Sequence, residues 1–318
     1  MKSMLKQKLT FLLKYSVGIA LLVWILSRIN RQKMVQTLLS IHWTTITAVL
    51  VIAVVNLFVQ YKRWKFLVEQ QSSDFKTNDL IPSFFAGFTF RLLLPGGHAE
   101  ISKIFLLPGR KSGKVMAFAI EKFFQTYVKT LLVLGGLPFL FPQYRWIFWG
   151  ILAALILVYP FLPALSRTRL LRRFQEKEVN YHRIFLKALL FSLGVFVCLI
   201  FQYYILLNDV HRIRFDQTLL TVIYIWGAGL IPVSISGLGV REGIAAVMLK
   251  QYGIPAAAAV GIALLVFVIN AIVPAVVGVF FIYQKQHHFK EAGQTFRQVS
   301  GRLYAHGKKQ LLKKKKSK

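Results

Sequence analysis

Apolar residues run along the chain in stretches long enough to cross a membrane as helices. Crossing about 30 Å of hydrocarbon takes roughly 20 helical residues. Unbroken stretches near this length lie at residues 11–27, 43–61, 115–141, 146–166, 184–207 and 256–283. The pattern predicts an all-α polytopic membrane protein with six transmembrane helices.

The ends of the first two stretches carry further predictions. No small-residue cleavage site precedes the end of the first stretch, so we expect a retained anchor rather than a signal peptide. The second stretch meets the basic run Lys62-Arg63-Trp64-Lys65. We expect this run to end the helix and a polar loop to continue to Asp79.

Two further apolar stretches, at residues 80–108 and 217–250, are broken in the middle. The first break contains Pro95-Gly96-Gly97 and the second contains Gly237-Leu238-Gly239, with charged residues beside both. Apolar flanks of about 10 to 15 residues are too short to span, and irregular backbone is tolerated at depth only inside protein or a water-filled cavity. Both stretches therefore predict re-entrant hairpins.

The distribution of basic residues predicts the orientation. With the N-terminus inside, 28 of the 41 Lys and Arg residues fall on the inner side and 7 on the outer side, as expected for cytoplasmic loops. Both termini are then cytoplasmic, with a basic leader at 1–10 and a basic tail at 284–318. A single transmembrane domain, 11–283, separates them.

This orientation makes the two hairpins enter from opposite sides. Each half, about 11–141 and 146–283, contains two spans, a hairpin and a further span in that order. Because the hairpins enter from opposite sides, the second half is predicted to be an inverted copy of the first. Both breaks also share Gly-x-x-Glu, ending at Glu100 and Glu242. Broken segments at matching places in inverted halves point to a transport site near the middle of the membrane.

Composition excludes several other classes of protein. The chain is 56% hydrophobic with a net charge of +30, which excludes disordered, collagen-like and disulfide-stapled proteins. One cysteine, Cys198, permits neither an internal disulfide nor a cysteine-based metal site. The segment 109–115 resembles a phosphate-binding P-loop but is one residue short. We therefore expect no catalytic residue, no metal and no cofactor.

The breaks themselves carry the candidate binding chemistry. A helix that restarts after a break presents unpaired N–H groups, which favour phosphate or carboxylate. Arg91 and Arg241 place a guanidinium beside each break, and its planar fork suits phosphate oxygens. Glu100 and Glu242 have two alternatives: they bind a cationic head group or proton, or they cap the restarted helix and neutralise the nearby Arg.

The third long stretch adds a polar stripe. Glu121, Gln125 and Lys129 recur four residues apart, on one helix face. The stripe lines a cavity or contacts the hairpins; the alternative is a Glu–Lys pair whose ends reach water. Lys187 is expected to extend from its span end to water. Asn270 and Pro274 predict a kink in the last span, either beside the binding site or as a proline bend without function.

Several of these residues are familiar as a set. The motifs Arg91-x-x-x-Pro-Gly-Gly-x-x-Glu-x-x-Lys103, Ile120-Glu121-Lys122 and Ser236-Gly-Leu-Gly-x-Arg-Glu242 resemble the membrane region of lysylphosphatidylglycerol synthases and the related stand-alone flippase-like family. The earlier Lys62-Arg63-Trp64 is similar to the Arg-Trp that follows this family's second span. The family usually has Arg where this chain has Lys103 and Lys122, which keeps the charge and loses the fork.

The resemblance implies a bacterial cytoplasmic membrane and a phospholipid ligand. Longer members add a soluble domain that transfers an amino acid from aminoacyl-tRNA to phosphatidylglycerol. About 35 residues follow the last span here, too few for such a domain. The basic tail is expected to bind the anionic inner leaflet rather than nucleic acid.

Three functions stay open. The leading hypothesis is a translocase for an anionic, amino-acylated or polyprenyl-phosphate lipid. The first alternative is a phosphatidylglycerol lysyltransferase or its membrane subunit, with lysyl-tRNA as a partner; the second is a non-transporting scaffold. A homo-oligomer is compatible with each. The candidate lipid-headgroup residues are Arg91, Gly96, Gly97, Glu100, Lys103, Glu121, Lys122, Ser236, Gly237, Gly239, Arg241 and Glu242.

Overall fold

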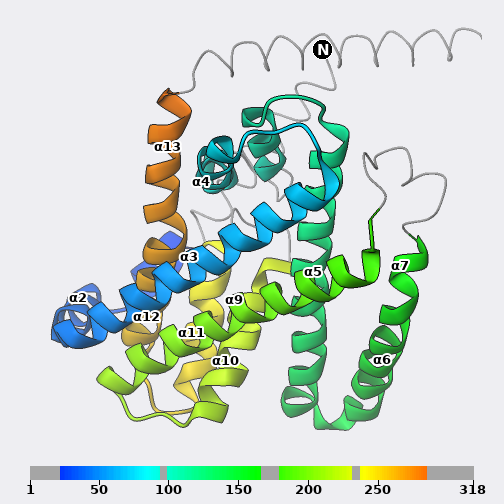
Figure 1. The fold of residues 1–318 in the computed structure, drawn as a ribbon. Coiled ribbons are helices and arrows are strands. Elements are labelled where there is room, and N and C mark those ends of the chain that lie inside the picture. Colours follow the sequence, from blue (N-terminus) through cyan, green and yellow to red (C-terminus); the bar gives the residue numbers. More distant parts are fainter. Residues whose placement is uncertain (1–21, 94–98, 166–178, 231–236, 285–318) are drawn as a thin grey trace, which may run out of the picture.

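A computed structural model describes residues 22–93, 99–165, 179–230 and 237–284, which are helical with no strand (Figure 1). The leader and almost all of the tail lie outside these ranges. The α-helices are α2 (Arg31–Ser40), α3 (Trp43–Gln71), α4 (Thr77–Leu93), α5 (Ser112–Leu140), α6 (Arg145–Val158), α7 (Leu162–Leu165), α9 (Tyr181–Val210), α10 (Phe215–Gly227), α11 (Val240–Lys250), α12 (Ala256–Phe267) and α13 (Val273–Gln284). The other elements are the 3-10 helices η1 (Ala99–Leu106), η2 (Pro142–Tyr144), η3 (Tyr159–Phe161) and η4 (Ala228–Leu230), and the π-turn η6 (Val268–Ile272).

Five helical stretches are long and apolar enough to cross a membrane. They are Trp43–Gln71, Ser112–Leu140, Pro142–Ala164, Tyr181–Val210 and Ala256–Gln284. They confirm five of the six predicted spans and hence a multi-pass membrane protein. The remaining one, predicted at 11–27, lies mostly outside the described residues, which begin with a helical segment at 22–28.

Exposed apolar side chains cover the outside of these helices. Leu50, Val54 and Phe58, four residues apart on α3, are each about half exposed or more. Helix α6 buries none of its side chains and packs chiefly on α5. Apolar faces of this extent are unfavourable in water and suit a lipid environment.

The second helix does not end where the sequence predicted. Helix α3 continues through the basic run to Gln71 and has no polar loop after Tyr61. Arg63 and Trp64 are almost fully buried on its inner face. A basic run ends a span when its charges must reach water, whereas Arg63 finds a buried carboxylate, so the helix has no reason to stop.

Two pairs of shorter helices occupy the stretches that the sequence predicted as hairpins. We call α4 with η1 the first helix pair and α10 with α11 the second. The members of each pair pack on one another. In the second pair, α10 has 13 residues and α11 has 11, which at 1.5 Å per residue is too short to span.

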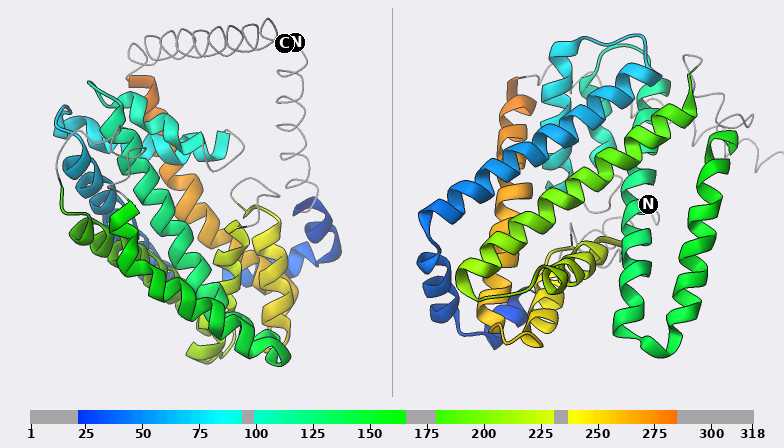
Figure 2. Two further views of the ribbon diagram at one scale, coloured as in Figure 1. Left: turned by 90° about the vertical axis from the view of Figure 1, so that its right-hand side faces the viewer. Right: turned by 60° about the horizontal axis from the view of Figure 1, so that its bottom comes forward.

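Each helix pair packs against the last long helix of the other half. Helix α4 lies along α13, where the Thr89 hydroxyl donates to the Ala275 carbonyl at 2.7 Å. Helix α10 lies against α5, where the Tyr224 hydroxyl donates to the Gly136 carbonyl at 2.5 Å. The two halves are thereby interlocked rather than side by side, as Figure 2 shows from two further directions.

Helices α3 and α9 run together obliquely across the molecule (Figures 1 and 2). A chain of amides joins them to the last span: Asn56 donates to Asn270 and Asn270 to Gln202, both at 2.9 Å. Asn270 lies within the π-turn that separates α12 from α13, followed by Pro274. The irregularity predicted at Asn270 is therefore a π-turn held by buried amides.

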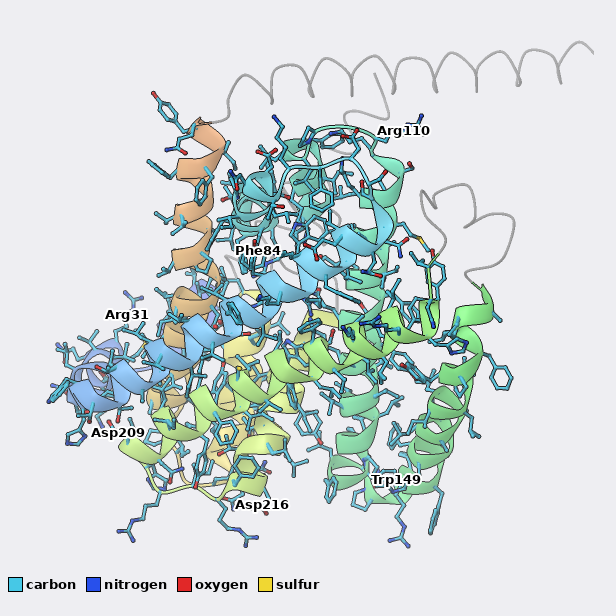
Figure 3. All side chains as sticks on the ribbon, in the orientation of Figure 1. Arg31, Phe84, Arg110, Trp149, Asp209 and Asp216 are labelled. Carbon is cyan, nitrogen blue, oxygen red and sulfur yellow. The ribbon has the colours of Figure 1, made fainter. Side chains whose placement is uncertain are left out.

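The long helices connect two ends of the molecule. Arg110 lies at the opposite end from Trp149 and Asp216 (Figure 3).

The tight contact of Gly278 with α4 predicts a stability effect. A Cβ at Gly278 would overlap the Phe85 carbonyl oxygen and the Thr89 side chain, whereas a Cβ at Gly150 meets nothing within 4 Å. We expect Gly278→Ala to lower the free energy of unfolding by about 1–3 kcal/mol. Gly150→Ala should be neutral or stabilise by up to about 1 kcal/mol. Thermal unfolding of both purified variants in detergent tests this; equal midpoints would contradict the close packing.

Candidate functional site

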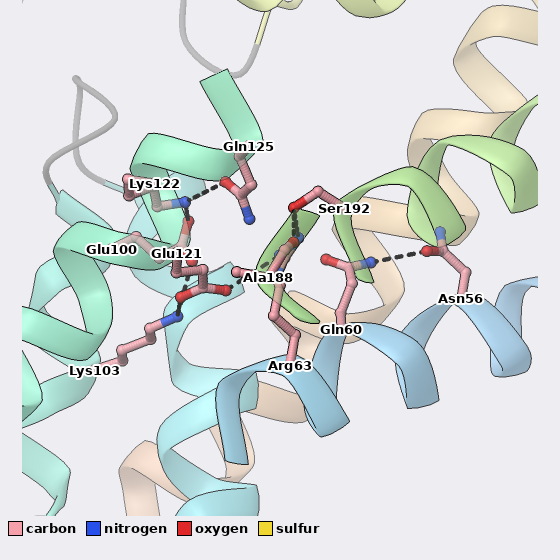
Figure 4. A network of polar contacts seen from close by, with 10 residues as sticks. All are labelled: Asn56, Gln60, Arg63, Glu100, Lys103, Glu121, Lys122, Gln125, Ala188 and Ser192. Atoms are coloured by element: carbon pink, nitrogen blue, oxygen red, sulfur yellow. Dashed lines mark hydrogen bonds and ion pairs between the residues drawn. The ribbon is translucent and has the colours of Figure 1, made fainter. Parts of the chain in front are cut away.

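Charged side chains from three elements meet inside the first half of the protein. Arg63 comes from α3, Glu100 and Lys103 from η1, and Glu121 and Lys122 from α5 (Figure 4). Arg63 and Lys103 are 1% exposed and Glu121 is 2% exposed. We call these five residues the ion network.

Two carboxylates hold the ion network together. Glu121 accepts from Arg63 at 3.2 Å through one oxygen and from the Lys103 ammonium at 2.6 Å through the other. Glu100 accepts from Lys103 at 3.1 Å and from Lys122 at 2.5 Å. A single ammonium at Lys103 therefore bridges both carboxylates, a contact that needs no guanidinium fork.

Neutral groups complete the surroundings. Arg63 also donates to the Ser192 hydroxyl of α9 at 3.2 Å, and Lys122 donates to the Gln125 side chain at 3.0 Å. The Lys103 ammonium lies 3.9 Å from the centre of the Trp64 ring. Buried charges are tolerated when they are paired and hydrogen-bonded in this way. The ion network thus joins α3, η1, α5 and α9.

Space for the ion network comes from a glycine in α4. A Cβ at Gly87 would lie 3.0 Å from the Lys103 side chain and 3.3 Å from the Glu100 side chain. Lys103 is also fixed through its backbone, because its carbonyl accepts from the buried Ser83 hydroxyl at 2.9 Å. The first helix pair therefore holds Glu100 and Lys103 in place from α4.

The second helix pair places Arg241 and Glu242 at the start of α11. Gly237 and Gly239 have φ of +77° and +82°, a region that side chains with a Cβ rarely adopt. Glu242 is fully buried and accepts from the Gly239 N–H at 2.6 Å. Its other oxygen lies 3.7 Å from the Arg241 guanidinium. Glu242 therefore caps the restarted helix, one of the two alternatives from the sequence.

This cap changes what the end of α11 offers to a ligand. The Gly239 N–H, which the sequence suggested for an anion, is used by Glu242. Among the described residues, Glu100 pairs with Lys103 and Lys122 and neutralises them. Both carboxylates thus hold the site together from within.

Arg91 and Arg241 stand apart from the balanced ion network. Arg91, near the end of α4, makes no hydrogen bond or ion pair with any described residue, and its buried Nε has no partner there. The buried Nε and Nη2 of Arg241 likewise lack an acceptor among the described residues. The two guanidiniums lie over the rings of Phe88 and Phe267, at 5.0 and 4.5 Å.

The two guanidiniums are close enough to influence one another. The charge of Arg241 acts on Arg91 together with the charges of Glu100 and Glu121. The structure therefore brings together one charge from each helix pair and the stripe of α5. Donors that lack acceptors in a buried place are costly unless another group supplies the acceptor.

Some candidate residues cannot be placed. Gly96, Gly97 and Ser236 lie outside the described residues, as does His98. The other nine candidates fall into the ion network or beside Arg91 and Arg241. Among the residues that the structure describes, no group of three or more His, Cys, Asp or Glu side chains could hold a metal ion.

Sequence reasoning missed Arg63 as a member of the site. The basic run that contains Arg63 predicts the end of a helix, although Lys62-Arg63-Trp64 is also one of the family motifs. Helical periodicity could have identified Arg63, because Asn56, Gln60 and Arg63 recur three or four residues apart on one face of α3. Gln60 donates to Asn56 at 3.2 Å, and Figure 4 shows this polar face continuing toward the ion network.

The ion network predicts a large difference between two identical substitutions. Glu121→Gln leaves Arg63 and Lys103 buried beside a neutral amide, and we expect a loss of about 3–5 kcal/mol in unfolding free energy. Glu69→Gln changes a partly exposed pair with Lys65 at 3.7 Å, with an expected loss of about 0–1 kcal/mol. Unfolding midpoints in detergent measure both. The network is not stabilising if the two variants unfold alike.

The comparisons with known proteins agree with this fold and these motifs. The family model described as "Lysylphosphatidylglycerol synthase TM region" matches residues 11–278. A comparison with the curated proteins finds no match. The matched segment contains both helix pairs and all the candidate residues. The chain belongs to the family of the lysylphosphatidylglycerol synthase transmembrane region.

Proposed function

We propose that this protein is a lipid translocase of the bacterial cytoplasmic membrane. It moves a lipid with an anionic, amino-acylated or polyprenyl-phosphate head group between the leaflets, with both termini in the cytoplasm. The proposal uses no catalytic residue, metal or cofactor. The anionic inner leaflet is the expected partner of the basic tail.

The interlocked packing of the helix pairs supports an inverted repeat. In this proposal α4 with η1 re-enters from the cytoplasm and α10 with α11 from outside. Each pair packs on the last span of the opposite half, through Thr89 on α13 and Tyr224 on α5. Two halves arranged in this way surround a shared central site, where rocking of one half against the other exposes the site to alternate sides.

The observation that carries the proposal is the pair of guanidiniums beside the breaks. Arg91 and Arg241 bring charge into an apolar domain, and neither donates a hydrogen bond to any described residue. Charge inside a membrane domain is costly and usually serves an ion or ligand. A lipid phosphate between them would accept from both, while its acyl chains stay in the bilayer.

The remaining candidate residues take supporting roles in this proposal. Glu100, Lys103, Glu121 and Lys122 hold the first helix pair in place, and only Lys122, at 27% side-chain exposure, is open enough to reach a head group. Gly237 and Gly239 shape the approach to Arg241. Gly96, Gly97 and Ser236 would supply backbone or hydroxyl donors at the breaks.

The family description favours a second candidate function. A lysylphosphatidylglycerol synthase attaches lysine to phosphatidylglycerol, so this chain would be such an enzyme or its membrane subunit, with lysyl-tRNA as a partner. Thin-layer analysis of lipids from cells with and without the gene separates the two. An enzyme changes which lipid species are present, and a translocase changes only their sidedness.

Reconstitution tests the translocase directly. Purified protein is placed in liposomes that contain fluorescent phosphatidylglycerol, lysyl-phosphatidylglycerol or polyprenyl phosphate, and dithionite reports how much label reaches the outer leaflet. We expect Arg91→Gln or Arg241→Gln to slow movement about tenfold or more, because a charge-assisted hydrogen bond contributes about 1.5–3 kcal/mol.

Arg145→Gln is the matched control, since Arg145 is exposed at the start of α6. The Arg145→Gln variant should move lipid at the rate of the unaltered protein. No movement of any of the three lipids would reject the translocase, and equal rates for all three variants would reject the role of the guanidiniums.

A further inference from the structure

Lys129 is a third cation at the same place, and the roles given above do not use it. It lies two turns beyond Glu121 on the polar face of α5. Its ammonium lies 5.1 Å from the centre of the Trp226 ring on α10. Within the described ranges it has no hydrogen bond or ion pair, so no carboxylate balances its charge.

The ammonium of Lys129 points at the second break. A Cβ on Gly229, in η4 between α10 and α11, would lie 3.0 Å from it. On the far side of the break, the Arg241 side chain folds back so that a Cβ on Gly237 would lie 3.2 Å from its Cγ. Two cations from different helices therefore lie at Gly229 and Gly237, described residues on the two sides of the second break.

Several like charges act on Lys129. The largest charge effects on it include those of three cations, Lys122, Arg91 and Arg241, and of one acid, Glu100. Glu100 is already paired with Lys103 and Lys122. An added anion would stabilise such an arrangement.

The charge balance of the whole site can be counted. With side chains in their ordinary ionised forms, the described residues of the site hold six basic groups and three acidic ones, an excess of three positive charges. The basic groups are Arg63, Arg91, Lys103, Lys122, Lys129 and Arg241, and the acidic groups are Glu100, Glu121 and Glu242.

We infer that Arg91, Lys129 and Arg241 bind a lipid head group with two or more negative charges, a phosphate monoester or a diphosphate. The inference rests on the proposed translocase and selects its substrate class. A phosphodiester such as phosphatidylglycerol brings one negative charge and leaves most of the excess positive charge of the site unbalanced. Lysyl-phosphatidylglycerol has a net positive charge and would add to it, whereas a phosphate monoester brings about two negative charges.

Binding to the purified full-length protein tests the inference independently of transport. Isothermal titration in detergent compares farnesyl diphosphate, farnesyl phosphate, dihexanoyl phosphatidylglycerol, its lysyl ester and inorganic pyrophosphate. We expect affinity to fall in the order diphosphate, monophosphate, phosphatidylglycerol and lysyl ester. Pyrophosphate should bind more weakly than farnesyl diphosphate, because it lacks an apolar chain to bury.

Variants of Lys129 locate the binding. Lys129→Met should weaken farnesyl diphosphate about tenfold or more, as the loss of one charge-assisted hydrogen bond implies. Lys129→Arg keeps the charge and should stay within about threefold of the unaltered protein. Lys187→Met is the matched control, because Lys187 also lies on a spanning helix with its ammonium 4.8 Å from a ring centre, that of Phe66.

Three results would overturn the inference. They are equal affinity for head groups of every charge, a Lys129→Met variant that binds as the Lys187→Met control does, and pyrophosphate that binds as tightly as farnesyl diphosphate. If the expected binding order is found while reconstituted protein moves no lipid, transport is wrong and the head-group assignment stands. If the reconstituted protein moves phosphatidylglycerol but does not bind the diphosphate selectively, transport stands and the head-group assignment is wrong.

Discussion

The buried carboxylate of Glu121 fixes the relation between the spans and the first helix pair. Each of its oxygens meets one cation, Arg63 from α3 and Lys103 from η1. Water is excluded from all three side chains, so each charge depends on the others for compensation. Burial of Arg63 and Trp64 on the inner face of α3, and of Lys103 on η1, is consistent with this one constraint.

The charged residues of the domain divide into a balanced and an unbalanced set. In the ion network every carboxylate oxygen has a cationic donor. The network joins the four elements α3, η1, α5 and α9. Arg91 and Lys129 form no ion pair with a described carboxylate, and Arg241 has only a 3.7 Å contact with Glu242, which also caps α11. The balanced set stabilises the fold. The unbalanced set is where an anionic ligand would gain the most electrostatic stabilisation.

The fold also contains elements suited to movement. The π-turn at Val268–Ile272 interrupts the last span beside the amide chain from Asn56 to Gln202. Such turns often occur at functional positions. Helix α4, which holds Arg91, packs along α13, the helix that follows this turn.

Hydrophobic patterning determined the spans, the two broken stretches and the placement of Arg91 and Arg241 beside them, since span length and the cost of buried charge are local properties of the chain. The family motifs could also be recognised from the sequence alone. Only the tertiary structure decided which charges compensate which: Arg63 is buried rather than in a loop, Glu242 is a cap, and Glu100 is a counterion. Charge compensation depends on partners that are distant in sequence, as Arg63 and Glu121 are, so periodicity within one helix does not specify it.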